Sequence, residues 1–453
     1  MTLFLGLLVG YIGVLIAISY YVGRSESDED YLIAGRDRPW WQILFSKYAA
    51  NVGAGYLLTQ TAFAYEFGIS LIPIVVTAIA GILIYAYYAA PRIYRVASEY
   101  RAYTQGDYVA AVTNYKPAQY LTNSAAAILA LLIVVISVSG GATLMEEFGV
   151  LSYEVAVFLT LGIVLMYIYA SGYKAVMITD VLQGLMMLVL LTVVAFGILS
   201  GHTVSSEVLL EARNLSPLGI IMISLFGIVG VFAYADRYQI TYAAGDERGL
   251  KKGMAWVFVP IVYTSVLLYV IGNVVYSVDP LIGSSAVYVV AIQDFLPAAL
   301  IPFAVIIFFA ALMSSADSYV YVLASHTQIF IGEALQKHML QIMTVLFGIL
   351  VAALALVFRE VVDLAIASAA VAFAISFPMI YLIIGYTDGC RFFAMLFLGL
   401  FGVVLGIITI GLVPDAAIMP FVCFLIGLTL PIEWIQGALD KVAPKYQNDY
   451  INK

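Results

Sequence analysis

Three serines and one aspartate lie close together in the middle of a long apolar run. The segment 309–321 reads Phe-Ala-Ala-Leu-Met-Ser-Ser-Ala-Asp-Ser-Tyr-Val-Tyr, and apolar residues dominate from 300 to 331. Hydroxyl, carbonyl and carboxylate oxygens are the ligands that a hard cation such as sodium prefers. The segment therefore predicts a cation site on a membrane helix. Helical geometry places Asp317 beside a face made of four small residues, which are Ala311, Ser314, Ser315 and Ser318.

Close helix packing offers another explanation for the serines and alanines, because small side chains let helices approach each other in lipid. That explanation does not account for Asp317. An acid at the centre of a membrane helix costs about 2.5–3.5 kcal/mol on insertion scales, and such residues mark functional sites by default. We therefore interpret Asp317 as part of a functional site.

The composition is that of a membrane protein with many spans. Of the 453 residues, 64% are hydrophobic and 11% are charged, which excludes an ordinary soluble domain. The sequence has none of the common metalloprotease, serine-hydrolase or phosphate-loop motifs, so we expect no enzymatic activity. A span needs about twenty apolar residues, which predicts an all-α polytopic protein with about thirteen transmembrane helices. The predicted spans are 3–23, 42–66, 70–90, 118–145, 150–171, 175–200, 216–243, 253–277, 296–330, 339–358, 361–385, 392–413 and 415–436.

Basic residues are distributed unevenly between the two sets of loops. Of the 20 Lys and Arg residues, only Arg213 and Arg359 lie in loops on one side, and Lys47 and Arg237 lie in or beside spans. Positive charges collect on the cytoplasmic side. We therefore predict a multi-pass protein of the cell membrane, with its N-terminus outside and its C-terminus in the cytoplasm. The predicted interface anchors are Trp40, Trp41 and Trp434.

Two predicted spans contain residues that are poor choices for the middle of a helix. The second span has an asparagine and two glycines within 45–56, and the seventh reads Phe-Gly-Ile-Val-Gly at 226–230. Glycines that merely allow close packing would explain one such span. Two interrupted spans in matching positions, five spans apart, instead predict inverted repeats and a solute site near the membrane midplane. The candidate solute-binding residues are Asn51, Gly53, Tyr56, Gly227, Gly230 and Tyr234.

The two predicted five-span repeats, together with the spans that precede and follow them, predict one transporter domain over residues 1–453. Residues 1–40 form an extra first helix and an inner loop, and residues 41–200 form the first five-helix repeat. Residues 216–386 form the second, inverted repeat. Residues 391–453 form two extra helices and a cytoplasmic tail.

Two further charges lie inside apolar spans, and the sequence leaves the role of each open. Asp180 lies about a turn and a half into the sixth span, where it either contributes to a cation site or pairs with a lysine near the interface. Lys47 lies one helical turn before Asn51. Its ammonium group either extends to the interface or pairs with Asp180 or Asp317. Pairing would neutralise one carboxylate when sodium is absent, which would make transport proton-coupled or uncoupled.

Several short motifs, in this order along the chain, resemble the sodium:solute symporter family. These are Tyr31-Leu-Ile-Ala-Gly-Arg36, Ala49-Ala-Asn-Val-Gly53, Tyr103-Thr-Gln-Gly-Asp107, Thr179-Asp-x-x-Gln183 and Ala311-x-x-Ser-Ser315. The resemblance implies the leucine-transporter fold, with two inverted five-helix repeats. It also implies a main sodium site formed by carbonyls of the first core helix and by a carbonyl and two hydroxyls of the eighth, at Ala49, Val52, Ala311, Ser314 and Ser315. A second cation site, found in some members, would use Asp180, Ser314, Asp317 and Ser318.

The chain departs from the family pattern at two places. The family usually has a Gln-Arg pair at the end of the seventh span, whereas this chain has Gln239-Ile240 with Arg237 displaced, and Lys47 is unexpected on the first core helix. The Ser-Ser-Ala-Asp-Ser sequence at 314–318 resembles the choline-transporter branch. Two solute classes stay open. An amino acid carboxylate would bind N–H groups of the interrupted helix, and a quaternary amine would bind aromatic faces.

We expect a secondary active transporter that couples Na⁺ to the uptake of a small polar organic solute, such as proline or another amino acid, by alternating access. The expected partners are the solute, sodium ions and the lipid bilayer. We expect a functional monomer that binds no nucleic acid. One rival is a transporter-like membrane sensor, which would need a separate signalling partner because only a short tail follows the last predicted span. The other is an intramembrane enzyme, for which the sequence offers no catalytic constellation.

Overall fold

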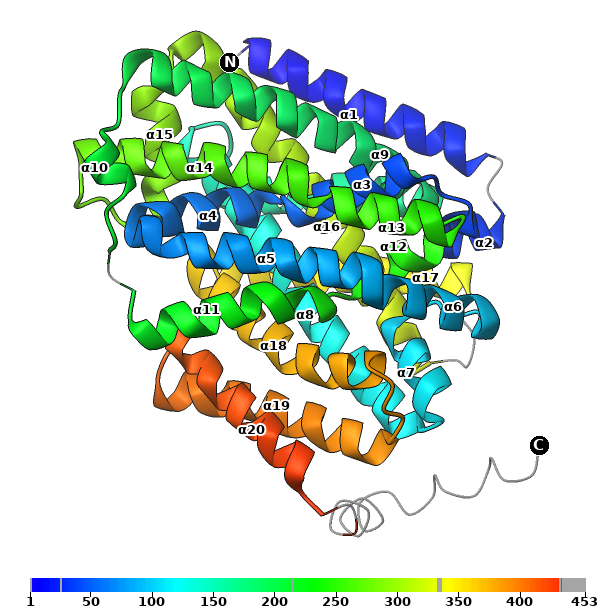
Figure 1. Ribbon diagram of the computed structural model, residues 1–453. Helices are drawn as coiled ribbons and strands as arrows, with labels where there is room; N and C mark the ends of the chain where they lie inside the picture. The colour runs from blue at the N-terminus through cyan, green and yellow to red at the C-terminus, as the bar shows by residue number, and fades with distance from the viewer. Residues whose placement is uncertain (1, 25–26, 214, 332–335, 432, 434–453) are drawn as a thin grey trace.

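The computed structural model describes residues 2–24, 27–213, 215–331, 336–431 and Glu433. Almost all of the described chain is helical, and the long helices run side by side in one bundle (Figure 1). Within these residues, ten helices are long and apolar enough to cross a membrane. The all-α, multi-pass prediction is confirmed.

The predicted count of thirteen spans is not confirmed, because three predicted spans lack a helix of full length. The span 42–66 is divided into two helices, and the segments Tyr153–Met166 and Pro414–Thr429 are shorter apolar helices. The interface anchor Trp434 and the basic residues of the predicted tail lie outside the described residues.

The first part of the chain forms short and interrupted helices. These are α1 (Thr2–Gly23), α2 (Asp28–Ile33), α3 (Trp40–Asn51), α4 (Ala54–Phe67), α5 (Ile72–Ile84), α6 (Ala90–Tyr100) and α7 (Gln105–Thr113). A π-helical segment, Tyr85–Ala89, joins α5 to α6 without a break. Ser27 and Thr104 cap α2 and α7 through their hydroxyl groups, which satisfies N–H groups that have no partner inside the helix.

Two long helices follow, α8 (Lys116–Glu147) and α9 (Tyr153–Gly201). The sequence predicts separate spans at 150–171 and 175–200, and the helical run α9 is interrupted between them at Gly172, whose backbone is not helical (φ 58°, ψ −160°). Gly172 has a φ of 58°, and a side chain there would overlap the ring of Tyr31. Glycine is therefore required, both for the backbone conformation and for the close approach of α2.

The second half repeats the pattern of one interrupted helix followed by long ones. Its helices are α10 (Ser206–Leu209), α11 (Pro217–Val229), α12 (Ala235–Ala243), α13 (Glu247–Trp256), α14 (Phe258–Val278), α15 (Val287–Phe295), α16 (Ile301–Gln328), α17 (Lys337–Val357), α18 (Val361–Ile383), α19 (Gly389–Thr409) and α20 (Ile418–Thr429). The interruption between α11 and α12 is a short 3₁₀ turn, Gly230–Phe232, followed by extended backbone at Tyr234. Gly227 belongs to α11, and the helix breaks at Gly230, the second glycine of the predicted 226–230 pattern.

Helix α16 lies at the centre of the bundle, against α8, α9, α3 and α4. Residues 304–326 of this helix are buried, although they include four serines, an aspartate and a histidine. Helix α1 lies at one edge of the bundle, and α19 and α20 lie at the opposite edge (Figure 1). The polar face of α16 is therefore directed at other helices, and the outer helices expose apolar side chains, as a lipid environment requires.

Candidate ion and solute sites

The break between α3 and α4 frees backbone carbonyl groups in the middle of the bundle. Helix α3 ends at Asn51, Val52 leaves the helical conformation with φ −94° and ψ 58°, and Gly53 is fully extended before α4 begins. The carbonyls of Ala49 and Ala50 lose their usual partners within the helix and accept hydrogen bonds from α16 instead. The interruption predicted from Asn51 and Gly53 is present.

Oxygen atoms of α3 and α16 come together at this break. The Ser314 hydroxyl lies 3.0 Å from the Ala49 carbonyl oxygen and 3.0 Å from the Ala311 carbonyl oxygen. The Ser315 hydroxyl lies 3.2 Å from the carbonyl oxygen of Ala50, a residue that the sequence analysis did not include. Val52, the remaining member of the predicted set, lies at the break itself and is fully buried. Such a cluster of buried neutral oxygens matches the chemistry that a sodium ion requires.

Gly53 is the residue that lets the two helices meet. A Cβ atom at this position would overlap the hydroxyl of Ser315 and would lie 3.4 Å from the Ala311 carbonyl oxygen. Because Gly53 has no side chain, α16 can lie close to the break. This role is separate from the low helix propensity of glycine.

Two acids form a second polar cluster beside the first. Asp180 on α9 is fully buried, and its carboxylate interacts electrostatically with that of Asp317 on α16. One Asp317 carboxylate oxygen accepts a hydrogen bond from the backbone N–H of Ser318 at 2.6 Å. The predicted members Asp180, Asp317 and Ser318 therefore lie in one buried region, where two like charges require a compensating cation or proton.

The second cluster also contains Ser46, which sequence reasoning missed, and Gln183, which the sequence analysis named only as part of a family motif. The Ser46 hydroxyl on α3 donates to one Asp180 carboxylate oxygen at 2.6 Å, whereas the other oxygen is buried without a hydrogen-bond partner. Gln183 donates to the Tyr11 hydroxyl on α1 at 2.6 Å, and its own carbonyl oxygen has no partner. Two buried acceptor oxygens without donors fit a site for a cation. Ser46 had no sequence signal beyond its place one residue before Lys47.

Lys47 is buried, and its ion-pair partner is Asp236 on α12. Both side chains are only 1% exposed, so Lys47 does not extend to the membrane interface. The alternative, pairing with Asp180 or Asp317, is also wrong, although Asp180 is near enough to act on Lys47 electrostatically. The Tyr319 hydroxyl donates to the other Asp236 carboxylate oxygen at 3.1 Å. The sequence signal for the Lys47–Asp236 ion pair was the presence of two adjacent charges, at 236 and 237, inside an apolar span.

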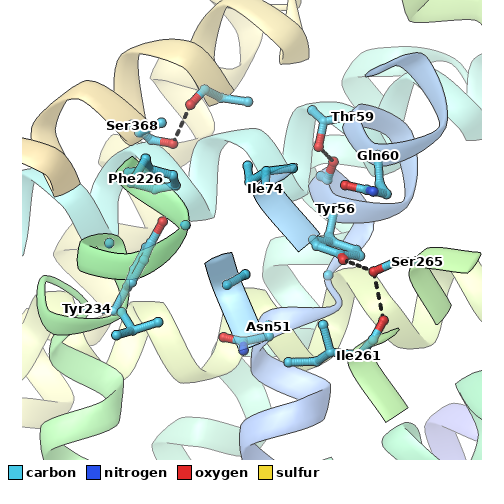
Figure 2. Close-up of a pocket in the computed structure, with 18 of the residues that line it drawn as sticks. Asn51, Tyr56, Thr59, Gln60, Ile74, Phe226, Tyr234, Ile261, Ser265 and Ser368 are labelled. Carbon is cyan, nitrogen blue, oxygen red and sulfur yellow. Dashed lines mark hydrogen bonds between the residues drawn. The ribbon is translucent and has the colours of Figure 1, made fainter. Parts of the chain in front are cut away.

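A cavity of about 340 Å³ lies where both interrupted helices pass through the bundle. Figure 2 shows Asn51, Tyr56 and Tyr234 around this space, with Tyr56 hydrogen-bonded to Ser265 at 2.7 Å. All six predicted solute-binding residues line it: Asn51, Gly53, Tyr56, Gly227, Gly230 and Tyr234. Gly227 also serves close packing, because a Cβ atom there would overlap the Thr77 hydroxyl on α5.

The cavity has polar lining residues that the sequence analysis did not select as solute-binding. Most of the remaining wall is apolar, with Ile74, Ile136 and Phe226 among its members. Single serines, threonines and glutamines within apolar spans are too common to indicate a site without the fold. The additional polar residues are Thr59, Gln60, Ser137, Arg237, Ser265, Ser315, Tyr319 and Ser368.

Two interrupted helices around a cavity with an apolar wall and a few polar groups, within a bundle of long apolar helices, define the class of this protein as a multi-pass membrane transporter. Residues 31–403 match the sodium:solute symporter family. The chain belongs to this family, whose members are transporters rather than enzymes.

The chain is similar to the sodium/proline symporters of Staphylococcus aureus strains Newman and JH9. Each is 27% identical over 245 residues, which is 50% of this chain and 46% of the relative. The chain thus spans about half the length of the curated relatives it matches.

Three solved structures share the fold. A Na⁺-coupled sialic acid symporter in a substrate-bound outward-open state has a TM-score of 0.78 at 14% identity, over 95% of this chain and 98% of that chain. MhsT in complex with L-phenylalanine has a TM-score of 0.62 at 13% identity, over 84% and 98%. Mhp1, a nucleobase-cation-symport-1 family transporter, has a TM-score of 0.59 at 12% identity, over 91% and 95%. These identities support the fold alone.

Proposed function

We propose that this protein takes up a small polar organic solute together with Na⁺ by alternating access. The observation that carries the proposal is that Ala50 and Ser315 belong both to the oxygen cluster and to the cavity wall. A cation at the cluster would order the same backbone that a solute contacts, so each would favour binding of the other. The family and the curated sodium/proline relatives support an amino acid such as proline as a candidate solute.

The main sodium site in this proposal comprises Ala49, Val52, Ala311, Ser314 and Ser315. A second cation site comprises Asp180, Asp317 and Ser318. Lys47 does not take the place of a cation in either, because its ammonium group is paired with Asp236. This pairing supports sodium coupling over proton-coupled or uncoupled transport.

The cavity supports an outward-facing state. Its lining runs from the helix breaks to Phe63 and Leu71, near the turn between α4 and α5. This turn contacts the loop carrying Arg213, on the side that the distribution of basic residues assigns to the outside. The Lys47–Asp236 pair lies on the opposite side of the breaks. In the proposed cycle, this pair separates when the cavity opens inward.

The driving force is adequate for concentrative uptake. A membrane potential of 100 mV contributes about 2.3 kcal/mol per charge, and a tenfold sodium gradient contributes about 1.4 kcal/mol. Roughly 3.7 kcal/mol per ion concentrates a neutral solute several hundredfold. One sodium ion per solute is therefore sufficient for concentrative uptake. A second ion would square the ratio of inside to outside solute concentration.

Uptake in proteoliposomes tests the proposal. Radiolabelled amino acids, sugars, carboxylates and choline are supplied with an inward sodium gradient, with an equal potassium gradient, or with sodium on both sides. We expect at least one solute to accumulate only under the sodium gradient. Accumulation that is the same under the sodium and the potassium gradient would contradict the proposal.

A further inference from the structure

Arg237 is a buried cation at the cavity that forms no ion pair within the described chain, although its guanidinium lies 5.5 Å from the centre of the Tyr234 ring. It follows the break in the seventh predicted span, lines the cavity and is 7% exposed. One terminal guanidinium nitrogen donates to the Val231 carbonyl at 3.2 Å, and Nε is buried without a hydrogen-bond partner. Among the described residues, no carboxylate forms an ion pair with it.

The acid next to Arg237 in the chain, Asp236, already has a partner for each of its carboxylate oxygens. One Asp236 oxygen pairs with Lys47, and the other accepts the Tyr319 hydroxyl. Lys47 and Arg237 are near enough to repel each other electrostatically. The charges of Lys47 and Asp236 compensate each other within their ion pair, whereas the Arg237 guanidinium is the charge that lines the cavity. A buried arginine is costly unless an anion pairs with it, so this arrangement is suited to an anion that enters from the cavity.

The backbone adds positive potential at the same place. Helix α12 begins directly after Tyr234, and helix α4 begins directly after Gly53. Both preceding residues line the cavity, so the N-terminal ends of both helices lie beside it. Helix N-termini carry a partial positive charge and favour anions. The only acid in the first turn of α12 is Asp236, whose charge is compensated by Lys47.

We propose that the transported solute carries a carboxylate and that Arg237 is the residue that selects for it. The inference rests on the proposed transport function and identifies its substrate class. The guanidinium binds the carboxylate through parallel hydrogen bonds, for which its planar geometry is suited. The apolar wall around Ile74, Ile136 and Phe226 receives the body of the solute. A quaternary amine without an acid group is rejected, since its charge would meet that of Arg237. This separates the two solute classes that the sequence leaves open.

Matched pairs of probes test the role of the carboxylate. Purified full-length protein is incubated with sodium or potassium and with L-proline, L-prolinamide, isovalerate, isovaleramide, choline or glucose, and its thermal unfolding is followed. We expect sodium-dependent stabilisation by L-proline or isovalerate and none by the corresponding amide or by choline. Equal stabilisation by an acid and its amide, stabilisation by choline or glucose alone, or no response to either acid would overturn the inference.

Variants of Arg237 test the residue itself. Arg237→Gln should raise the carboxylate concentration for half-maximal stabilisation at least tenfold, and Arg237→Lys should raise it less. The stabilisation by sodium alone, measured on the same samples, should remain in both variants and so shows that they are folded. Arg92→Gln, at an exposed position, should behave like the parent protein. An unchanged carboxylate response in Arg237→Gln would contradict the assignment.

The outcome also separates this inference from the proposed function. Sodium-dependent uptake of choline or glucose, with no carboxylate transported, overturns the inference and keeps symport. Carboxylate binding that requires Arg237 but is the same in sodium and potassium keeps the inference and overturns sodium coupling.

Discussion

The ammonium group of Lys47 on α3 forms a buried ion pair with the carboxylate of Asp236 on α12, and so connects the two interrupted helices to each other. The residues are 189 positions apart in the chain. Each lies on the side of its helix break away from the Phe63 end of the cavity. The pair therefore joins the two helical segments that would have to separate for the cavity to open on that side.

Breaking this pair should destabilise the protein, and neutralising both partners should restore much of the loss. Removing one member of a buried ion pair costs about 3–5 kcal/mol, because the other charge stays buried. We expect Lys47→Met and Asp236→Asn each to lower the unfolding temperature and to reduce uptake. The double variant should be more stable than either single one, since the asparagine oxygen still accepts the Tyr319 hydroxyl.

A double-mutant cycle on thermal unfolding measures this coupling. Lys174→Met serves as a control, because its ion pair with Asp30 at 2.9 Å is partly exposed and should contribute less. Strictly additive losses for Lys47 and Asp236 would show that the pair is not coupled.

Ser314→Ala and Ser315→Ala should raise the sodium concentration for half-maximal uptake. A hydrogen bond or ligand contact to a charged group contributes about 1.5–3 kcal/mol, which corresponds to roughly a tenfold to hundredfold change in sodium affinity. Ser376→Ala is a matched control, because its hydroxyl is also buried and bonds to its own helix, at the Ala372 carbonyl. Identical sodium responses in all three variants would rule out the proposed ligands.

Gly53→Ala should weaken sodium binding without any loss of a ligand atom. The added methyl group would overlap the Ser315 hydroxyl, so α16 must move away from the break. Gly10→Ala on α1 has open space around it and should preserve activity. The measurement is sodium-dependent thermal stabilisation of both variants. A Gly53→Ala protein with parental sodium affinity would mean that the oxygen cluster tolerates a wider separation.

The number of sodium ions moved per solute tests the second cation site. If Asp180 and Asp317 hold an ion, Asp180→Asn should lower the stoichiometry from two to one. Ser46→Ala, which removes the donor at 2.6 Å from Asp180, should have the weaker effect. Asp294→Asn, at an exposed position, provides the control. The reversal potential of solute-driven current in proteoliposomes gives the stoichiometry, and a value of one in the parent protein would remove the second site from the mechanism.

Much of this architecture was determined locally by the sequence. The extended apolar segments require helices in lipid, because backbone groups there must be satisfied within the segment. Asn51 and Gly53 interrupt the second predicted span at the position observed. The serine face of α16 follows from helical periodicity alone, and it meets the Ala49 and Ala50 carbonyls that this break releases.

The pairing of charges was decided only by the tertiary structure. A lysine inside an apolar span requires an acid, and Asp180, Asp236 and Asp317 are all acids within apolar spans of this chain. The choice depends on the rotation and depth of α3, α9, α12 and α16 relative to one another, which side-chain packing among distant segments determines. The same holds for Arg237. The sequence showed only that Arg237 is a charge beside a helix break. Its position in the cavity wall, and the ion pair of the adjacent Asp236 with Lys47, follow from the tertiary structure.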